Sequence, residues 1–289
     1  MARFQEPFTG LSAFCAVPVL ATILVVTGCD KTVPEVRPTD QVQGPAGVLH
    51  VDDGGTGGVP VVFVHGYGGD TEQWSAQLAH LRPYRRAVAL DLRGHGKSAP
   101  PANNDYAVES LAADIGAVVD SLGLTRFVLV GHSMGGAAII AYAAAHPDRV
   151  AGLVMVGAPG RTPPEMGQQI MAQIEANYDS VTALYWEQLL TDAQPGVREK
   201  VAGRMRSVPK EPSLAIIGTL MRYDPVPPLT QYPGPKLAVH ASRENTPNDL
   251  QNLIPGLPHR TIEQASHWMH MDKPEEFNRI LDEFLAGVK

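Results

Sequence analysis

Short runs of β-branched and other apolar residues alternate along this chain with longer segments that have helical spacing. Between these runs, segments such as Val108–Leu122 repeat apolar residues every three or four positions, as in a helix with one buried face. Continuous apolar runs are typical of strands buried on both faces, and strands alternating with helices form mostly parallel sheets with right-handed crossovers. The pattern predicts a doubly wound α/β fold. The four clearest runs are 59–65, 86–91, 127–131 and 150–156.

This alternation stops near residue 160 and resumes near residue 236. Residues 160–232 have helical patterns but no convincing strand, whereas Lys236–His240 and Arg260–Glu263 are further strand candidates. Asp272-Lys-Pro-Glu275 has the spacing of a capping box and predicts a last helix through about Ala286. We expect residues 160–232 to form a helical cap over the carboxyl ends of the strands, where ligands bind in open α/β sheets.

The first 28 residues have the features of an export signal. Leu11–Val26 is an apolar and nearly uncharged run that leads into Val26-Thr-Gly-Cys29. The run is shorter than a membrane-spanning helix, which needs about 20 residues, and its length suits a signal peptide. This ending resembles a bacterial lipobox, in which cleavage precedes a cysteine that carries lipid. We expect residues 1–28 to be a lipoprotein signal peptide and lipidated Cys29 to anchor an exported cell-envelope protein to a bacterial membrane. An ordinary signal peptide or a short anchor is the alternative.

The segment after Cys29 is rich in proline and polar residues. Residues 29–46 are therefore predicted to be the lipidated cysteine and a tether, with the folded domain at 47–289. The other cysteine of the chain, Cys15, lies within the apolar run of the expected signal peptide. The mature domain therefore has no pair of thiols for a disulfide. A net charge of −7 without a cluster of Lys and Arg argues against a nucleic acid partner.

One serine lies at the junction of a predicted strand and the small-residue helix Met134–Ala145. The local sequence is Gly131-His-Ser-Met-Gly135. A serine hydroxyl is a poor nucleophile unless a base takes its proton, and it must project from the sheet into a cleft. A tight strand-to-helix turn achieves this but crowds its neighbours, which explains a glycine two residues on either side. Ser133 is therefore the predicted nucleophile.

Four motifs occur in this order along the chain: His65-Gly-Tyr-Gly68, Asp91-Leu-Arg-Gly-His-Gly-Lys-Ser98, Gly131-His-Ser-Met-Gly135, and Ser266-His267 ahead of Pro274-Glu-Glu-Phe277. Over about residues 47–287 these motifs resemble the α/β-hydrolase-fold family. The resemblance implies that His267 is the general base and that the backbone N–H groups of Tyr67 and Met134 form an oxyanion hole. His270 is the rival base, whereas His65 and His132 are expected to pack or to orient loops beside the site.

The position of the triad acid departs from the family pattern. The strand candidate that ends at Ala241 is followed by Ser-Arg-Glu244-Asn-Thr-Pro-Asn-Asp249, with no aspartate at the expected place. Chain order requires an acid between the serine and the histidine, so a carboxylate of this loop is favoured. Glu244 is the first candidate and Asp249 the alternative, whereas Asp91 and Asp224 are expected to be structural.

These residues predict a serine hydrolase that cleaves a small-molecule carboxylic ester, or less readily an amide, through an acyl-enzyme. Ser133 argues against the related dehalogenases and epoxide hydrolases, whose nucleophile is aspartate. The alternatives are a cofactor-free haloperoxidase or perhydrolase, a carbon–carbon bond hydrolase, and a lipid-anchored binding protein without turnover. No metal-ligand spacing or dinucleotide fingerprint is present, so we expect no metal and no cofactor. The natural substrate and the oligomeric state stay open.

Overall fold

The computed structural model describes residues 40–288, which contain an eight-stranded sheet with the strand order β1-β2-β4-β3-β5-β6-β7-β8. The pairs β1/β2 and β2/β4 are antiparallel, and every pair from β4 to β8 is parallel. The predicted doubly wound α/β fold is therefore confirmed. The strands are β1 (Gln41–Gly44), β2 (Gly47–Gly54), β3 (Val61–Val64), β4 (Ala87–Leu90), β5 (Phe127–His132), β6 (Val150–Val156), β7 (Lys236–Ala241) and β8 (His259–Ile262).

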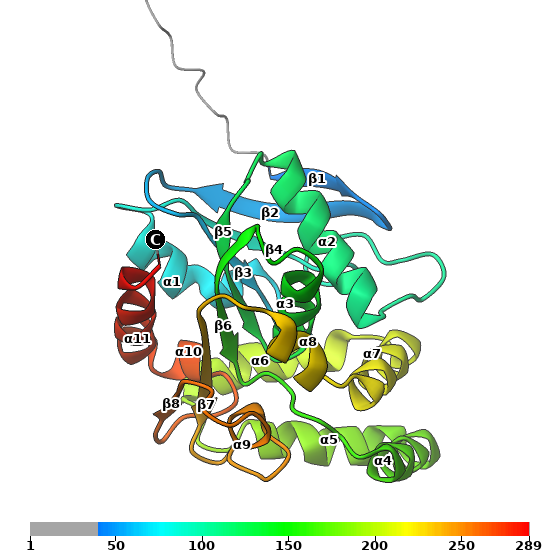
Figure 1. Cartoon of the computed structure of the whole chain (residues 1–289). Coiled ribbons are helices and arrows are strands. Elements are labelled where there is room, and N and C mark those ends of the chain that lie inside the picture. Colours follow the sequence, from blue (N-terminus) through cyan, green and yellow to red (C-terminus); the bar gives the residue numbers. More distant parts are fainter. Residues whose placement is uncertain (1–39, 289) are drawn as a thin grey trace, which may run out of the picture. The chain divides into compact units, whose positions relative to one another are not determined.

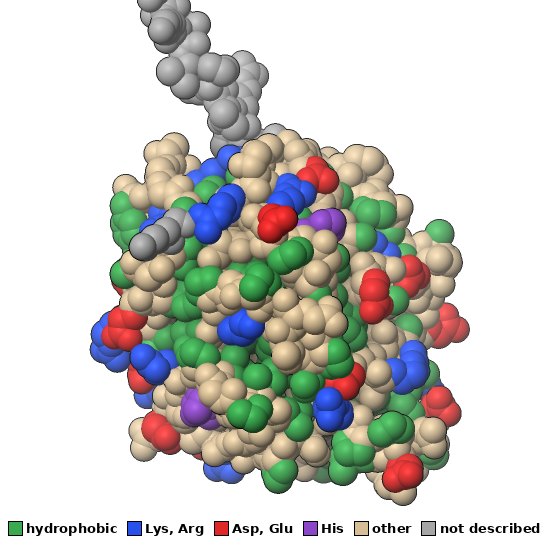
Figure 2. Space-filling model, in the orientation of Figure 1, with side chains coloured by type: hydrophobic (Ala, Val, Ile, Leu, Met, Phe, Trp, Pro, Cys, Tyr) green, Lys and Arg blue, Asp and Glu red, His purple; other side chains and the backbone are tan. Residues whose placement is uncertain are grey.

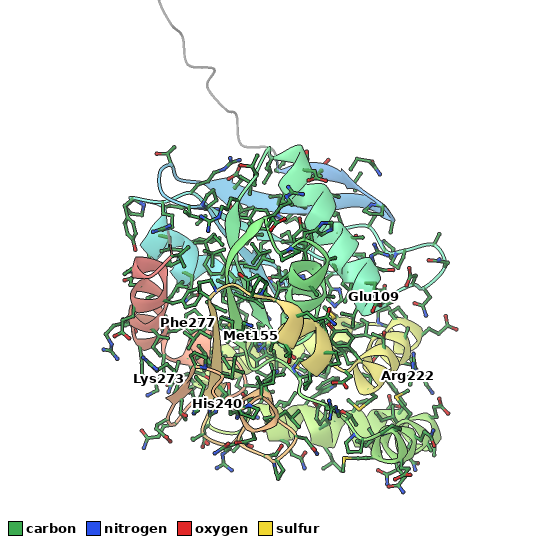
Figure 3. The ribbon with its side chains drawn as sticks, in the orientation of Figure 1. Glu109, Met155, Arg222, His240, Lys273 and Phe277 are labelled. Atoms are coloured by element: carbon green, nitrogen blue, oxygen red, sulfur yellow. The ribbon has the colours of Figure 1, made fainter. Side chains whose placement is uncertain are left out.

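Helices cover both faces of the sheet (Figure 1). The strand β3 shows why, because successive side chains point to opposite faces. Val61 and Phe63 pack with the cluster around α1 and α11, where Phe277 lies (Figure 3), whereas Val62 and Val64 pack with the cluster around α2 and α3. The covering helices are η1 (Thr71–Trp74), α1 (Ser75–Leu81) and α11 (Pro274–Ala286) on one face, and α2 (Val108–Ser121) and α3 (Met134–Ala145) on the other.

The amino-terminal edge of the sheet starts earlier than the sequence predicted. The tether was expected to reach residue 46, but Gln41–Gly44 pairs with β2 as a strand. Val42 is buried between the exposed side chains of Gln41 and Gln43, so the segment has the period-2 pattern of a strand despite its polar composition. The folded domain therefore includes the last part of the expected tether. The predicted signal peptide, including Cys29, lies outside the described residues.

Most of the cap lies beyond the carboxyl ends of β5 and β6 (Figure 1). The insertion between β6 and β7 is helical, and its last helix, α8, packs against α3. Arg161 precedes the first helix of the insertion, α4, and Asp224 follows the fourth, α7. Arg161 Nε and Asp224 Oδ2 are 2.9 Å apart, so this ion pair joins the two ends of the four-helix segment and gives Asp224 a structural contact. The helices of the insertion are α4 (Pro164–Ala176), α5 (Tyr178–Leu189), α6 (Pro195–Ser207), α7 (Lys210–Arg222) and α8 (Val226–Gln231).

The surface in Figure 2 intersperses acidic and basic side chains among apolar and neutral ones. No helix within residues 40–288 combines the length and hydrophobicity needed to cross a bilayer.

Candidate active site

Ser133 lies at a strained turn between β5 and α3. Its φ of 50° and ψ of −116° are unusual for a residue with a side chain, and a strained backbone of this kind costs about 1–3 kcal/mol. The Ser133 amide donates to Val156 O at 2.9 Å, which fixes the turn to the neighbouring strand β6. Such strain persists only where the surrounding structure holds it in place.

The two glycines that flank Ser133 make this turn possible. A Cβ added at Gly131 would lie 2.5 Å from Gly135 O, and one added at Gly135 would lie 2.4 Å from His65 O. Both contacts are with backbone atoms that a rotamer change cannot move. The close approach brings the first turn of α3 against the end of β3, as the glycine spacing predicted.

Two residues from different loops form a hydrogen-bonded pair in the same site. His267 follows β8 and donates from Nδ1 to Glu244 Oε1, while Glu244 Oε2 accepts from the Ala241 amide at 3.2 Å. In the neutral histidine this donation places the proton on Nδ1 and leaves Nε2 as an acceptor. Asp249 is engaged differently, because its Oδ2 accepts from the Thr246 amide at 2.5 Å.

The backbone of His267 is held on both sides. Its amide donates to Leu189 O of α5 at 3.1 Å, and its carbonyl oxygen accepts from His132 Nε2 at 2.9 Å. His132 is buried next to Ser133, so this contact links the serine turn to the histidine loop. The expectation that His132 orients a loop agrees with this geometry.

The Asp272 carboxylate also fixes the histidine loop through hydrogen bonds. This role was not predicted from the sequence. Oδ2 accepts from the Ser266 amide at 2.9 Å and from Ser266 Oγ at 2.5 Å, and Oδ1 accepts from the Gln194 amide of the cap at 2.8 Å. The predicted capping box was wrong, because Lys273 precedes α11 and has no side-chain cap. Asp272 instead ends α10 (Met269–Asp272), and its carboxylate is committed to Ser266 and the cap.

Gly157 is a second site residue without a sequence signal. It has a φ of 52°, and an added Cβ would lie 3.0 Å from His267 Cε1 and 3.3 Å from Glu244 Oε2. The end of β6 therefore passes directly beneath the Glu244–His267 pair. A side chain here would be strained by its φ and would press on both partners.

The loop after β3 brings Tyr67 beside the serine turn. An added Cβ at the preceding Gly66 would lie 3.1 Å from Ser133 Cβ. Within residues 40–288, neither the Tyr67 amide nor the Met134 amide has a protein acceptor. The Met134 amide is in the first turn of α3, where the helix dipole favours negative charge. Both amides thus lie beside the serine turn without a hydrogen-bond acceptor from the described part of the chain.

The side chain of Tyr67 has a separate structural role. Its hydroxyl donates to Ser213 Oγ on α7 at 2.9 Å, and its ring stacks on Trp186 of α5 with centroids 4.8 Å apart. Burial raises the pKa of Tyr67, so the hydroxyl keeps its proton for this hydrogen bond. Tyr67 therefore joins the sheet loop to two helices of the cap.

The remaining histidines near the site are buried and neutral. Burial lowers the pKa of His65 to about 4; its Nδ1 donates to Gly66 O and its Nε2 accepts from the Leu92 amide. Burial also lowers the pKa of His270 to about 3. The His270 ring stacks on Trp74 with centroids 4.2 Å apart, and within residues 40–288 its two nitrogens have no hydrogen-bond partner. His270 lines neither cavity described below.

Two cavities meet at Ser133 and His267. The larger has a volume of about 240 Å³, and its wall includes Met155 of β6 and His240 of β7, both labelled in Figure 3. The smaller has a volume of about 50 Å³ and lies under the cap, between Tyr67 and α7. Glu244 and Asp249 both line the larger cavity, but only Glu244 contacts His267. Asp91 is buried and accepts from the Thr71 and Lys97 amides, in agreement with a structural role.

Within residues 40–288 no cluster of His, Cys, Asp and Glu has the arrangement of a metal site. The groups assembled around Ser133 are a hydroxyl, an imidazole, a carboxylate and two free amides. Groups of these kinds are the ones that proteins use for proton transfer and for stabilising an oxyanion.

Comparison with known proteins agrees with the fold. The model of the α/β-hydrolase fold family matches residues 59–192. The putative carbamate hydrolase RutD of Caulobacter segnis is 30% identical over 247 residues, which cover 79% of this chain and 91% of that protein. A non-heme haloperoxidase of Rhodococcus erythropolis is 42% identical over 123 residues, or 42% of this chain and 41% of the relative. The structure of a thermophilic esterase from Thermogutta terrifontis matches with a TM-score of 0.71 and 26% identity, over 85% of this chain and 97% of that one. The chain belongs to the α/β-hydrolase family.

Proposed function

We propose that this protein is a serine hydrolase that cleaves carboxylic esters, and amides less readily, through an acyl-enzyme. The observation that carries the proposal is the hydrogen bond from His267 to Glu244 at the cavity that Ser133 also lines. The similarity to a solved esterase supports the same reaction. No other carboxylate within residues 40–288 is hydrogen-bonded to a nitrogen of the His267 ring.

In the proposed mechanism Ser133 Oγ attacks the ester carbonyl while His267 Nε2 takes its proton. Glu244 fixes the tautomer of His267 and stabilises the imidazolium that forms. The amides of Tyr67 and Met134 donate to the oxyanion, and losing one such donor typically costs about 2.7–4 kcal/mol of barrier. His267 then protonates the leaving alcohol, and water attacks the acyl-enzyme with His267 again acting as base.

The test is to trap the acyl-enzyme. Rapid mixing with p-nitrophenyl acetate should release a burst of p-nitrophenol, and quenched samples should carry one acetyl group on the peptide that contains Ser133. Turnover with an acetyl group on another residue would contradict the proposed nucleophile. Specific binding of esters without any turnover would favour a non-catalytic binding protein.

A second candidate is a cofactor-free perhydrolase, favoured by the 42% identity to a non-heme haloperoxidase over 123 residues. In that reaction hydrogen peroxide replaces water as the nucleophile that attacks the acyl-enzyme, and a peracid is released. Adding peroxide to the ester assay and measuring peracid separates the two activities. A peracid yield that exceeds the carboxylate yield at millimolar peroxide would favour the perhydrolase.

We further propose that Cys29 is lipidated and anchors an exported protein to a bacterial membrane. The support is the sequence Val26-Thr-Gly-Cys29 after the apolar run. Each buried methylene of an acyl chain contributes about 0.8 kcal/mol, so two or three chains give stable attachment. Cys29→Ser should block both lipidation and the removal of residues 1–28. Mass analysis that finds an unmodified Cys29 in processed wild-type protein would overturn this proposal.

A further inference from the structure

We infer that the site divides its ester substrate into a short apolar acyl group and a larger polar alcohol, with helix α5 as the partition. This inference rests on the proposed serine hydrolase activity. It concerns the two cavities that meet at Ser133 and His267, here called the acyl chamber (about 50 Å³) and the alcohol cavity (about 240 Å³).

The acyl chamber is small and mostly apolar. A cavity needs a volume of roughly 10–15 Å³ to hold one water molecule. A chamber of about 50 Å³ therefore admits a few carbon atoms at most. Ligand pockets for larger molecules have volumes of about 300–1,000 Å³. Apart from Ser133 and the two histidines, the wall is built by Tyr67, Trp186, Met205, Ile217, Leu220 and Met221, with Tyr185, Leu189 and Trp268 completing it.

The alcohol cavity is several times larger and is partly polar. Its wall includes the side chains of His240, Arg243, Thr246 and Gln251 as well as apolar strand residues. Arg243 uses Nε to bind Asp192 at 2.6 Å, and within residues 40–288 its two terminal nitrogens have no partner. Free guanidinium donors at the rim favour an alcohol that carries oxygen acceptors.

Helix α5 separates the two spaces. Tyr185 and Leu189, one turn apart on this helix, line both cavities, as do Ser133 and His267. The Leu189 carbonyl also accepts from the His267 amide, so the partition is fastened to the histidine loop. An ester bound at Ser133 therefore has room for one part on each side of α5.

The candidate oxyanion hole indicates which cavity receives the acyl group and which receives the alcohol. The Tyr67 amide is available to the carbonyl oxygen, and the Tyr67 ring forms part of the acyl chamber. The alcohol leaves with a proton from His267, and the Glu244 that orients this histidine lines the other cavity. The acyl carbon chain is thus assigned to the chamber beside Tyr67, and the leaving alcohol to the cavity beside Glu244.

The experiment compares p-nitrophenyl acetate, butyrate and octanoate with the full-length enzyme. We expect kcat/KM to fall at least about tenfold from butyrate to octanoate, because the four extra methylene groups do not fit the chamber and would have to push its packed wall apart. Ile217→Ala enlarges the acyl chamber. It should therefore raise the ratio of kcat/KM for the octanoate to kcat/KM for the acetate at least about fivefold. Ile216→Ala is the matched control, because this neighbour on α7 is buried but lines neither cavity.

The alcohol side is tested with acetate esters of glycerol and of hexanol. Wild-type enzyme should prefer the glycerol ester, and Arg243→Gln should reduce that preference at least about threefold through loss of hydrogen bonds. Arg198→Gln, at an exposed cap arginine outside both cavities, is the control.

A wild-type preference for octanoate, or an unchanged ratio in Ile217→Ala, would overturn the assignment of the acyl chamber. Acetate hydrolysis that depends on Ser133 would still support the proposed function in that case. Failure to cleave any ester would remove both proposals together.

Discussion

The carboxyl edge of the sheet and the cap contribute to the site in different ways. β5 is buried along its whole length, and backbone contacts at Gly131 and Gly135 fix the turn that follows it. Helix α5 of the cap buries only Thr182 fully, and Tyr185 is 46% exposed. The sheet edge thus fixes the Ser133 turn through backbone contacts, whereas α5 contributes partly exposed side chains to the walls of the two cavities.

The sheet edge and the cap are nevertheless joined by hydrogen bonds and ion pairs close to the site. Tyr67 binds Ser213 of α7, Arg204 of α6 forms ion pairs with Asp70 and Glu72, and the His267 amide binds α5. Changes at the sheet edge should therefore alter the rate of chemistry, and changes in the cap should alter substrate choice.

Ser133→Ala should abolish esterase turnover and leave the fold intact. Removing the nucleophile of a serine hydrolase typically costs several orders of magnitude in kcat. Steady-state kinetics on p-nitrophenyl acetate, with circular dichroism as the control for folding, provides the measurement. An alanine variant that keeps more than about a tenth of wild-type kcat/KM would refute the assignment of the nucleophile.

Asp272→Asn should loosen the tie between the histidine loop and the cap. An asparagine nitrogen cannot accept from Ser266, so His267 should be less well placed, and we expect kcat to fall by about 10–100-fold. KM for p-nitrophenyl acetate should change little, because Asp272 lines neither cavity. Asp282→Asn on α11 is the control at an exposed carboxylate. Equal losses in kcat for the two variants would argue against a positioning role for Asp272.

His270→Phe should make the domain less sensitive to acid. Burial lowers the pKa of His270 to about 3, so between about pH 6.5 and 3 the unfolded chain binds a proton that the folded chain does not. Stability is therefore lost as the pH falls through this window, by roughly 1–2 kcal/mol at pH 5 for one such histidine. Phenylalanine keeps the stacking on Trp74 and removes this contribution.

Urea unfolding at pH 7 and pH 5 measures the effect. The loss of unfolding free energy between the two pH values should be smaller in His270→Phe than in wild type. The same substitution at exposed His259 provides the control. An identical pH dependence of wild type and His270→Phe would contradict the buried neutral state.

The sequence predicted those parts of the molecule that depend on local pattern. Buried strands such as Val150–Val156 and the turn at Ser133 follow from apolar runs and glycine spacing, and both lie where expected. The edge strand Gln41–Gly44 was missed because a short, half-exposed strand has few apolar residues. Local pattern is thus most reliable where both faces of a strand are buried.

The contacts that join distant segments could not be read from the sequence. Asp272 has the local spacing of a helix cap, but Ser266 and Gln194 compete successfully for its carboxylate. Gly157 has no motif, because its constraint is the close approach of His267. The choice between Glu244 and Asp249 likewise depends on how the loop after β7 folds, and local spacing does not determine that.

Kinetics of Glu244→Gln and Asp249→Asn on one activated ester decide which carboxylate serves His267. In the proposed mechanism, loops at the sheet edge assemble the triad, with the Glu244 carboxylate oriented toward His267. Glu244→Gln should lower kcat by roughly 10²–10⁴ with little change in Tm, since the amide keeps the shape and loses the charge. Asp249→Asn should cost less than about tenfold, because its carboxylate accepts only from the loop backbone. A near-normal Glu244→Gln beside a crippled Asp249→Asn would contradict the account.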